Sequence, residues 1–464
     1  DSIWAPGRRL RLPATRESME HAMNWHILAQ GLLVLSCLGI GSRMGGVAVG
    51  LWGGVGVLLL STFFHLAPGG FPIAAITIIL SVVTAAGAMQ AAGGIDYLVG
   101  IAHRILRSRP HSITYLAPYV SWIFTIGAGT GNVYYPLLPV IEETSYNNKV
   151  RPERPLALSP EASQLGITSS PVSAAMAVML GILAPLGFEL NHILLIVLPS
   201  TVISIAVAAF IQNRVGKELD RDPAFLRRLE AGDVQKPDYT PPDLKRITMR
   251  AKCSVYAFLC GILLVVLFGL VDSLRPQIQM PDGHTKPMAM TQLIAIVMMV
   301  AGIVILLIGK VNPGDIPRSN VFQSGMVSVL ALMGIAWMAN TFIGAHKELL
   351  SSVMLGQVEQ HVWLLPVAYY ATAALTTSQS TTTLIVTPVA IAMGISPAFI
   401  VASWLAVIGI HFFPANGSQI ATIQFDRSGT TRIGGFVLNH SFLLPNVIVA
   451  SVSVLTGFLI ASAF

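Results

Sequence analysis

The sequence predicts an all-α polytopic membrane protein of two inverted repeats, each with about five transmembrane helices and one re-entrant hairpin. Three observations support this fold class. Of the 464 residues, 53% are hydrophobic and 11% are charged, whereas soluble domains carry roughly 25% charged residues. Apolar runs of about 20 residues, long enough to cross a bilayer as helices, recur along nearly the whole chain. The pattern of the first half then returns in the second half.

The apolar segments divide the chain into four parts. Residues 1–26 form a polar, Arg-rich tail without an initiator Met, so its native status stays open and we exclude it from the fold. The first repeat, 27–212, has apolar segments at 27–42, 44–64, 71–92, 112–141, 157–187 and 190–212. The second repeat, 251–464, has them at 251–271, 289–309, 320–343, 361–393, 397–423 and 440–462. The charged, Pro-containing stretch 213–250 between them is expected to be a cytoplasmic linker.

The two halves correspond at an offset close to 249 residues. In both, the fourth segment is interrupted by small polar residues and then followed by a proline, Pro139 or Pro388. "GAGTGN" (127–132) in the first half corresponds to "TSQSTT" (377–382) in the second. The fifth segments are interrupted as well. Matching interrupted segments are a sequence sign of a transporter site, although a coincidence of loop lengths is the alternative.

The distribution of basic residues predicts the orientation. If each fourth segment is a hairpin that returns to its own side, 21 of the 28 Lys and Arg residues fall in loops on one side and 3 on the other, with 4 in the tail. Basic loops face the cytoplasm, so both termini are expected in the periplasm. The net charge of +6 is therefore ascribed to these loops, and no nucleic-acid partner is expected.

The interrupted segments carry the expected binding chemistry. Non-helical backbone at membrane depth is tolerated where protein buries it or a wet cavity solvates it. The N-terminus of a broken helix exposes N–H groups that bind anions. The candidate binding residues are Gly129, Thr130, Gly131, Asn132, Thr168, Ser169, Ser170, Ser378, Gln379, Ser380, Thr381, Thr382, Thr383, Asn416 and Ser418. For any one of them, close helix packing is the competing interpretation. For "GVAVGLWGGVG" (46–56) we prefer a packing face.

Ionisable residues look sparse inside the predicted spans. Asp96, Glu161 and Glu189 all fall near segment boundaries in this pattern, which argues against a carrier centred on an intramembrane carboxylate. His411 is read as interfacial and able to titrate. Neither a metal-site spacing nor a nucleotide-binding motif is present. We therefore expect no metal, no cofactor and no catalytic residues.

Six stretches together resemble the bacterial anaerobic C4-dicarboxylate transporters of the Dcu type. They are "GSRMGGVAVGLWGGVGVLLL" (41–60), "AMQAAGGIDYLV" (88–99), "GAGTGNVYYPLLPVI" (127–141), "ITSSPVSAA" (167–175), "GIAWMANTF" (334–342) and "GTTRIGGFVLNHSFLLP" (429–445). The resemblance implies a secondary carrier of the inner membrane for small organic dianions: fumarate, malate, succinate and, as a further candidate, aspartate. Exchange and ion-coupled uptake both stay open, as do Na+ or H+ coupling and a homo-oligomeric state in the lipid membrane.

By the same resemblance, the two hairpin tips match the family's binding elements, while Asp96 and Arg432 match motifs to which no role is assigned. One departure concerns Thr383, because the family pattern places a basic residue there. Two alternatives remain. One is a cation-coupled carrier of another organic anion, and the other is an intramembrane enzyme that uses Ser169 or Ser418 with His411.

Overall fold

The computed structural model describes residues 16–44, 47–232, 234, 247–279, 284–354, 363–414, 416–434 and 438–464. Most of the N-terminal tail and the middle of the linker lie outside the described residues. The side chain of Asn132 also lies outside them, so the prediction for it stays a prediction.

The described residues are mainly helical, as the sequence predicts, and they include one pair of short antiparallel strands. The first half contains α1 (Arg16–Met44), α2 (Ala48–Phe63), α3 (Ile73–Ala91), α4 (Gly94–Ser108), α5 (Ile113–Ala128), the 3-10 helix η2 (Gly131–Leu137), α6 (Leu138–Asn147), α7 (Glu153–Ser169), α8 (Ala174–Leu183) and α9 (Leu190–Gln212). The linker contributes α10 (Pro223–Glu230). The second half contains α11 (Met249–Leu270), β1 (Gln277–Gln279), β2 (Thr285–Pro287), α12 (Met290–Gly309), α13 (Asn320–Met354), α14 (Leu364–Thr376), α15 (Gln379–Ala392), α16 (Pro397–Trp404), the 3-10 helix η7 (Leu405–His411), α17 (Gly417–Phe425) and α18 (Leu443–Ala461).

Six helical stretches of the described chain are long and apolar enough to span a membrane, or seven if α3 and α4, bent by 75°, count as one span. The stretch that contains α7 and α8 is the most enclosed: 72% of its apolar window is buried, against 39% for α12. Because lipid-facing helices leave one side uncovered, α7 and α8 lie at the centre of the molecule and α12 at its edge.

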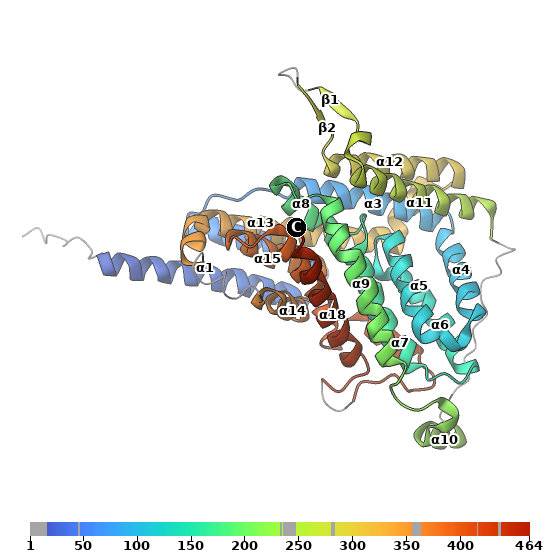
Figure 1. The fold of residues 1–464 in the computed structure, drawn as a ribbon. Coiled ribbons are helices and arrows are strands. Elements are labelled where there is room, and N and C mark those ends of the chain that lie inside the picture. The colour runs from blue at the N-terminus through green and yellow to red at the C-terminus, as the bar shows by residue number, and fades with distance from the viewer. Residues whose placement is uncertain are drawn as a thin grey trace, which may run out of the picture.

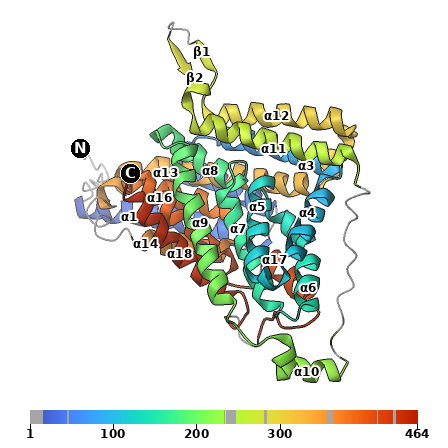
Figure 2. The ribbon, with the colours of Figure 1, turned by 45° about the vertical axis from the view of Figure 1, so that its right-hand side comes forward.

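Helices of the two halves pack directly against each other. Figures 1 and 2 show α11 and α12 lying along α3, while α5, α7 and α9 run at a steep angle to that layer. Contacts of α2 with α13 and of α3 with α12 are among the most extensive in the fold. The core of the molecule therefore joins the two halves.

The α2–α13 contact depends on glycines, which confirms the packing interpretation of "GVAVGLWGGVG". A Cβ built on Gly50 would lie 1.9 Å from the carbonyl oxygen of Leu330, and one on Gly53 would lie 2.3 Å from the carbonyl carbon of Gly334. Small residues let two membrane helices approach to backbone contact.

Three elements lie where the sequence pattern predicts loops. Helix α4 covers much of 103–111, α13 extends to Met354, and β1 pairs with β2 within 272–288. Helix α4 carries charged residues, such as Asp96 and Arg107, beside a buried face that includes Val99, Ala102 and Leu106. A search for uninterrupted apolar runs misses such an amphipathic helix.

Candidate functional site at the broken helices

The first break lies between α5 and η2. Gly129 ends α5 with a φ of +68°, and its N–H donates to the carbonyl of Thr125 at 2.8 Å. A Cβ on Gly129 would lie 2.7 Å from the carbonyl oxygen of Val172, in the break between α7 and α8. Two features therefore favour glycine at this position. One is its left-handed backbone, and the other is its close approach to the break between α7 and α8.

The second break lies between α14 and α15. Thr377 takes a φ of +50°, and the hydroxyl of Ser378 accepts the N–H of Thr381 at 3.3 Å. The first N–H groups of a helix have no intrahelical partner. Ser378 caps that of Thr381, and those of Gln379 and Ser380 lie in the first turn, where no partner within the helix exists. The second tip thus presents the positive end of a helix dipole.

The two tips meet at one side chain of the central helix α7. Gln379 donates from Nε2 to the carbonyl oxygen of Gln164 at 3.0 Å and to its Oε1 at 3.3 Å. On the other side, a Cβ built on Gly131 of the first tip would lie 3.3 Å from Nε2 of Gln164. Gln164 therefore hydrogen-bonds to the second tip and lies next to the first, so it sits between the tips from the two halves.

The side-chain amide of Gln379 has one atom, the oxygen Oε1, that is not hydrogen-bonded. Its Oε1 is buried and has no hydrogen-bond partner among the described residues. Buried polar atoms are nearly always paired, so an orphan of this kind marks a place for water or a ligand.

The hydroxyls at the α7–α8 break hydrogen-bond to backbone groups at the ends of helices. Ser170 donates to the carbonyl of Ile126 at 2.7 Å, which ties this break to the end of α5. Ser173 caps α8 by accepting the N–H of Met176 at 3.1 Å. Thr168 and Ser169 both donate to the carbonyl of Leu165, and Ser169 also accepts Nε1 of Trp122. The structure does not bring these last two hydroxyls to the tip junction.

The threonines of the second tip hydrogen-bond mainly within their own helix and its cap. Thr382 donates to the carbonyl of Ser378 at 2.8 Å, and Thr383 donates to that of Gln379 at 2.8 Å. Thr383 also accepts Nε1 of Trp404 at 2.7 Å and is fully buried. A basic residue at position 383 would therefore have to replace a packed hydroxyl beside Trp404.

Two cavities lead to the first tip. A small one of about 70 Å³ is lined by Gly129, Thr130 and Val172 together with side chains of α3 and α13. A larger one of about 390 Å³ is lined by Gln90, Tyr135 and the start of α13. Both include Val321 and Ser324, so they adjoin each other. The larger cavity falls within the size range of small-ligand sites.

The remaining candidates, Asn416 and Ser418, belong to a network with His411 and with Glu161, whose part in it the sequence pattern did not reveal. Ser418 Oγ lies 2.9 Å from Nε2 of His411, and Nδ1 of His411 lies 2.9 Å from Oε1 of Glu161. Glu161 and His411 have no exposed surface. The interpretation of Glu161 as a boundary residue and of His411 as interfacial is therefore wrong, because α7 continues eight residues to either side of Glu161 within the most enclosed part of the fold.

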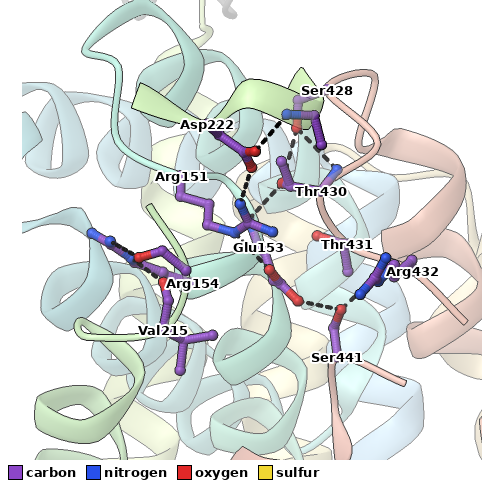
Figure 3. A network of polar contacts seen from close by, with 12 residues as sticks. Arg151, Glu153, Arg154, Val215, Asp222, Ser428, Thr430, Thr431, Arg432 and Ser441 are labelled. Carbon is purple, nitrogen blue, oxygen red and sulfur yellow. Dashed lines mark hydrogen bonds and ion pairs between the residues drawn. The ribbon is translucent and has the colours of Figure 1, made fainter. Parts of the chain in front are cut away.

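A second polar network joins the linker to the base of α7 (Figure 3). Arg151 pairs with Glu153 and with Asp222, the residue that caps α10. Ser441 donates to Oε1 of Glu153 at 2.6 Å and accepts the N–H of Arg432 at 3.1 Å. Arg432 thus helps to hold the loop before α18 against α7, whereas Asp96 lies in the first turn of α4, away from both networks.

Comparison with known proteins gives the family. The model of the family described as anaerobic C4-dicarboxylate membrane transporters matches residues 26–464. The anaerobic C4-dicarboxylate transporter DcuB of Escherichia coli O6:H1 is 37% identical, covering 94% of this chain and 98% of its own. The C4-dicarboxylate transporter DcuA of Helicobacter pylori is also 37% identical, covering 92% of this chain and 97% of its own.

Two solved structures share the fold at lower identity. The YdaH transporter of Alcanivorax borkumensis matches with a TM-score of 0.59 at 20% identity, covering 88% of each chain. MtrF of Neisseria gonorrhoeae matches with a TM-score of 0.50 at 15% identity, covering 87% of this chain and 84% of its own. The alternative of an intramembrane Ser/His enzyme is set aside because the DcuA and DcuB relatives and the matching family are named as transporters. The chain is a multi-pass membrane protein and belongs to the anaerobic C4-dicarboxylate transporter family.

Proposed function

We propose that this protein is a secondary carrier of the bacterial inner membrane that moves C4-dicarboxylates by exchange or by ion-coupled uptake. Fumarate, malate and succinate are the expected substrates, with aspartate as a further candidate. The observation that carries the proposal is the junction at Gln164, where broken helices from both halves of the chain converge. The DcuA and DcuB relatives, named as C4-dicarboxylate transporters, support the substrate class.

The chemistry of the junction suits a small dianion. The N-terminus of α15 offers backbone N–H groups and a positive dipole end, which favour a carboxylate. Gly129 and Gly131 let a ligand approach the backbone of the first tip closely. A buried dianion needs such compensation, because an unpaired charge is costly away from water.

An inverted relation between the halves is part of the proposal, and the packing of the helices supports it. At an offset near 249 residues, α2 corresponds to α12 and α3 to α13. The extensive contact of α3 with α12 then corresponds to that of α13 with α2. Two halves related in this way provide two equivalent arrangements, one open to each side of the membrane.

The cavities support an access route from the cytoplasm. The charge pattern assigns the ends of α3 and α13 that carry Gln90 and Asn320 to the cytoplasmic side. These residues line the larger cavity, which adjoins the smaller one at the first tip.

Counterflow in proteoliposomes tests the proposal. Vesicles that hold purified protein and internal succinate should take up labelled fumarate without ATP, since the sequence has no nucleotide-binding motif. Unlabelled malate and aspartate should compete, whereas a monocarboxylate should not. Strict dependence on ATP would exclude a secondary carrier, and competition by the monocarboxylate alone would favour a carrier of another anion.

A further inference from the structure

The buried pair of Glu161 and His411 lies beside the tip junction. Oε2 of Glu161 accepts a hydrogen bond from Nδ2 of Asn446 at 2.9 Å, and Oε1 of Glu161 contacts His411. Asn446 also accepts the hydroxyl of Tyr370 and donates to the carbonyl of Ile408 at 2.8 Å. Both carboxyl oxygens are therefore engaged, and the acidic group faces a titratable ring.

The protonation state of this pair decides its net charge. With Glu161 ionised and His411 protonated, the pair is neutral overall. Loss of one proton leaves a net negative charge, which is expensive in a site without solvent contact. Because the two groups interact directly, their protons belong to the pair and not to either residue alone. Within the membrane, ionisable groups of this kind commonly mark proton pathways.

Other titratable side chains of the described residues also interact with the pair. Tyr134 and Tyr370 interact electrostatically with Glu161, and His440 interacts with both members of the pair. Nε2 of His440 lies 3.0 Å from the carbonyl oxygen of Phe412, while its Nδ1 is buried without a hydrogen-bond partner among the described residues.

Two contacts connect the pair to the tips. Glu161 and Gln164 are three residues apart on α7, so they lie on the same face of the helix, one turn apart. Gln164 sits between the two tips, as described above. On the other side of the pair, Ser418 contacts His411 through the first turn of α17, and a Cβ on the adjacent Gly417 would lie 3.0 Å from the hydroxyl of Tyr135 in η2.

We propose that Glu161 and His411 form a proton-binding pair whose occupancy is linked to dicarboxylate binding at the tips. This inference rests on the proposed function. A dianion at the junction raises the cost of a further negative charge one helical turn away, so it favours the protonated, neutral pair. By linkage, the proton favours the dianion to the same extent. Proton and substrate would then cross together during net uptake, whereas exchange of one dicarboxylate for another needs no net proton movement.

Proton flux and substrate flux are measured together in proteoliposomes of the full chain with an internal pH dye. Vesicles without internal substrate should acidify as labelled fumarate enters. In E161Q and H411Q this acidification should be lost, while counterflow of fumarate against succinate persists. E143Q is the matched control, because Glu143 is also a buried carboxylate but pairs with Arg107 at the rim of the fold. It should keep the proton-to-fumarate ratio of the wild type.

The outcomes separate the two proposals. Fumarate entry without proton movement in the wild type would overturn the proton pair and leave the carrier function intact, as would a wild-type proton-to-fumarate ratio in E161Q. If E161Q does not fold, E161D should retain coupled uptake with a shifted pH profile, and an unchanged profile would count against the pair.

If the wild type takes up no dicarboxylate, the carrier function fails. The acid-minus-alkaline infrared spectrum of the purified protein then tests the pair on its own: H411Q should alter the carboxyl band of Glu161, and an unaltered band would refute the pair.

Discussion

Polar side chains at the breaks have two distinct tasks. Ser170, Ser173 and Ser378 use their hydroxyls to satisfy backbone groups that the interrupted helices leave open. Gln379 instead reaches across to Gln164 and keeps a buried carbonyl oxygen without a partner among the described residues. The first group makes the broken helices possible, and the second can accept a hydrogen bond from water or from a donor group on a ligand.

Replacement of Gln379 by Ala should weaken fumarate binding. It removes the amide that joins the second tip to Gln164, so the arrangement of the tips that binds substrate loses a contact worth roughly 1–3 kcal/mol. Since about 1.4 kcal/mol is tenfold in affinity, we expect a loss of about tenfold in competition assays on purified protein. Q292A, on an exposed face at the start of α12, is the matched control. Wild-type affinity in Q379A would mean that the link to Gln164 is a packing contact only.

Glu142 should make stability depend on pH. This carboxylate lies in the stretch 142–156 that the charge pattern assigns to the cytoplasm, and Oε1 accepts the N–H of Arg427 at 2.7 Å. Burial and the nearby Asp426 carboxylate outweigh that hydrogen bond and raise the pKa of Glu142 to about 7 from an ordinary 4.5. The folded protein thus holds this proton more tightly than the unfolded chain. Its contribution to stability is full below pH 4.5 and is lost as the pH rises through about 7.

Thermal unfolding across this pH range checks the effect. In E142Q the amide oxygen can still accept the N–H of Arg427 but does not titrate, so the fall in melting temperature with rising pH should be smaller than in the wild type. E230Q, which changes an exposed carboxylate on α10, should follow the wild-type curve. Equal slopes in E142Q and the wild type would contradict the assignment.

The sequence could predict some of these residues and not others. The glycines and hydroxyls at 129–131 and 378–380 interrupt apolar runs, so composition alone locates both tips. The buried position of Glu161 was not predicted, because its helix begins with the charged and polar sequence "ERPLALSPEAS", which resembles a loop that leads into a span. Only the fold reveals that His411, 250 residues away, lies against it. Pairings between distant segments leave no local signal.

At the scale of elements, each of the two breaks follows a short helix. Helix α5 has 16 residues and α14 has 13, each less than the roughly 20 needed to cross a bilayer. Each ends in a left-handed residue, Gly129 or Thr377. These residues break the helical path, and the chain continues as η2 or α15.

Replacement of Gly129 by Ala should destabilise the first hairpin and lower transport. A left-handed backbone costs a non-glycine residue roughly 1–2 kcal/mol, and the new Cβ would also meet the carbonyl oxygen of Val172 at 2.7 Å. G187A separates the two effects, because Gly187 has a φ of +79° but no atom within 4 Å of the built Cβ. The melting temperature should fall further in G129A than in G187A. Equal falls would mean that the contact with Val172 relaxes at no cost.

The long apolar elements were predictable because each buries or exposes a continuous run. The apolar segments 190–212 and 289–309 correspond closely to α9 and α12. Helix α4 and the β1–β2 pair were not predictable in this way. One is amphipathic with a stripe of buried residues, and the other is three residues long in each strand. Neither produces an apolar run of membrane length.

For the whole molecule, an inverted relation between the halves would place corresponding loops on opposite sides of the membrane. The loop 65–70 corresponds to 310–319 at an offset close to 249 residues. The distribution of Lys and Arg assigns the first to the periplasm and the second to the cytoplasm. A parallel relation would place both on the same side, so the two arrangements predict different accessibilities for one pair of positions.

Cysteine labelling tests this arrangement directly. In a background without Cys37, Cys253 and Cys260, the exposed residues Ala67 and Asp315 are each replaced by Cys. An impermeant maleimide should label A67C in intact cells but D315C only in inverted vesicles, because the two loops face opposite compartments. K286C on β2 and S108C at the end of α4 serve as reference positions for the periplasmic and cytoplasmic sides. If A67C and D315C are labelled from the same side, the halves are not inverted. The tips would then lack the two symmetry-related arrangements, one open to each side of the membrane, that the proposed carrier needs.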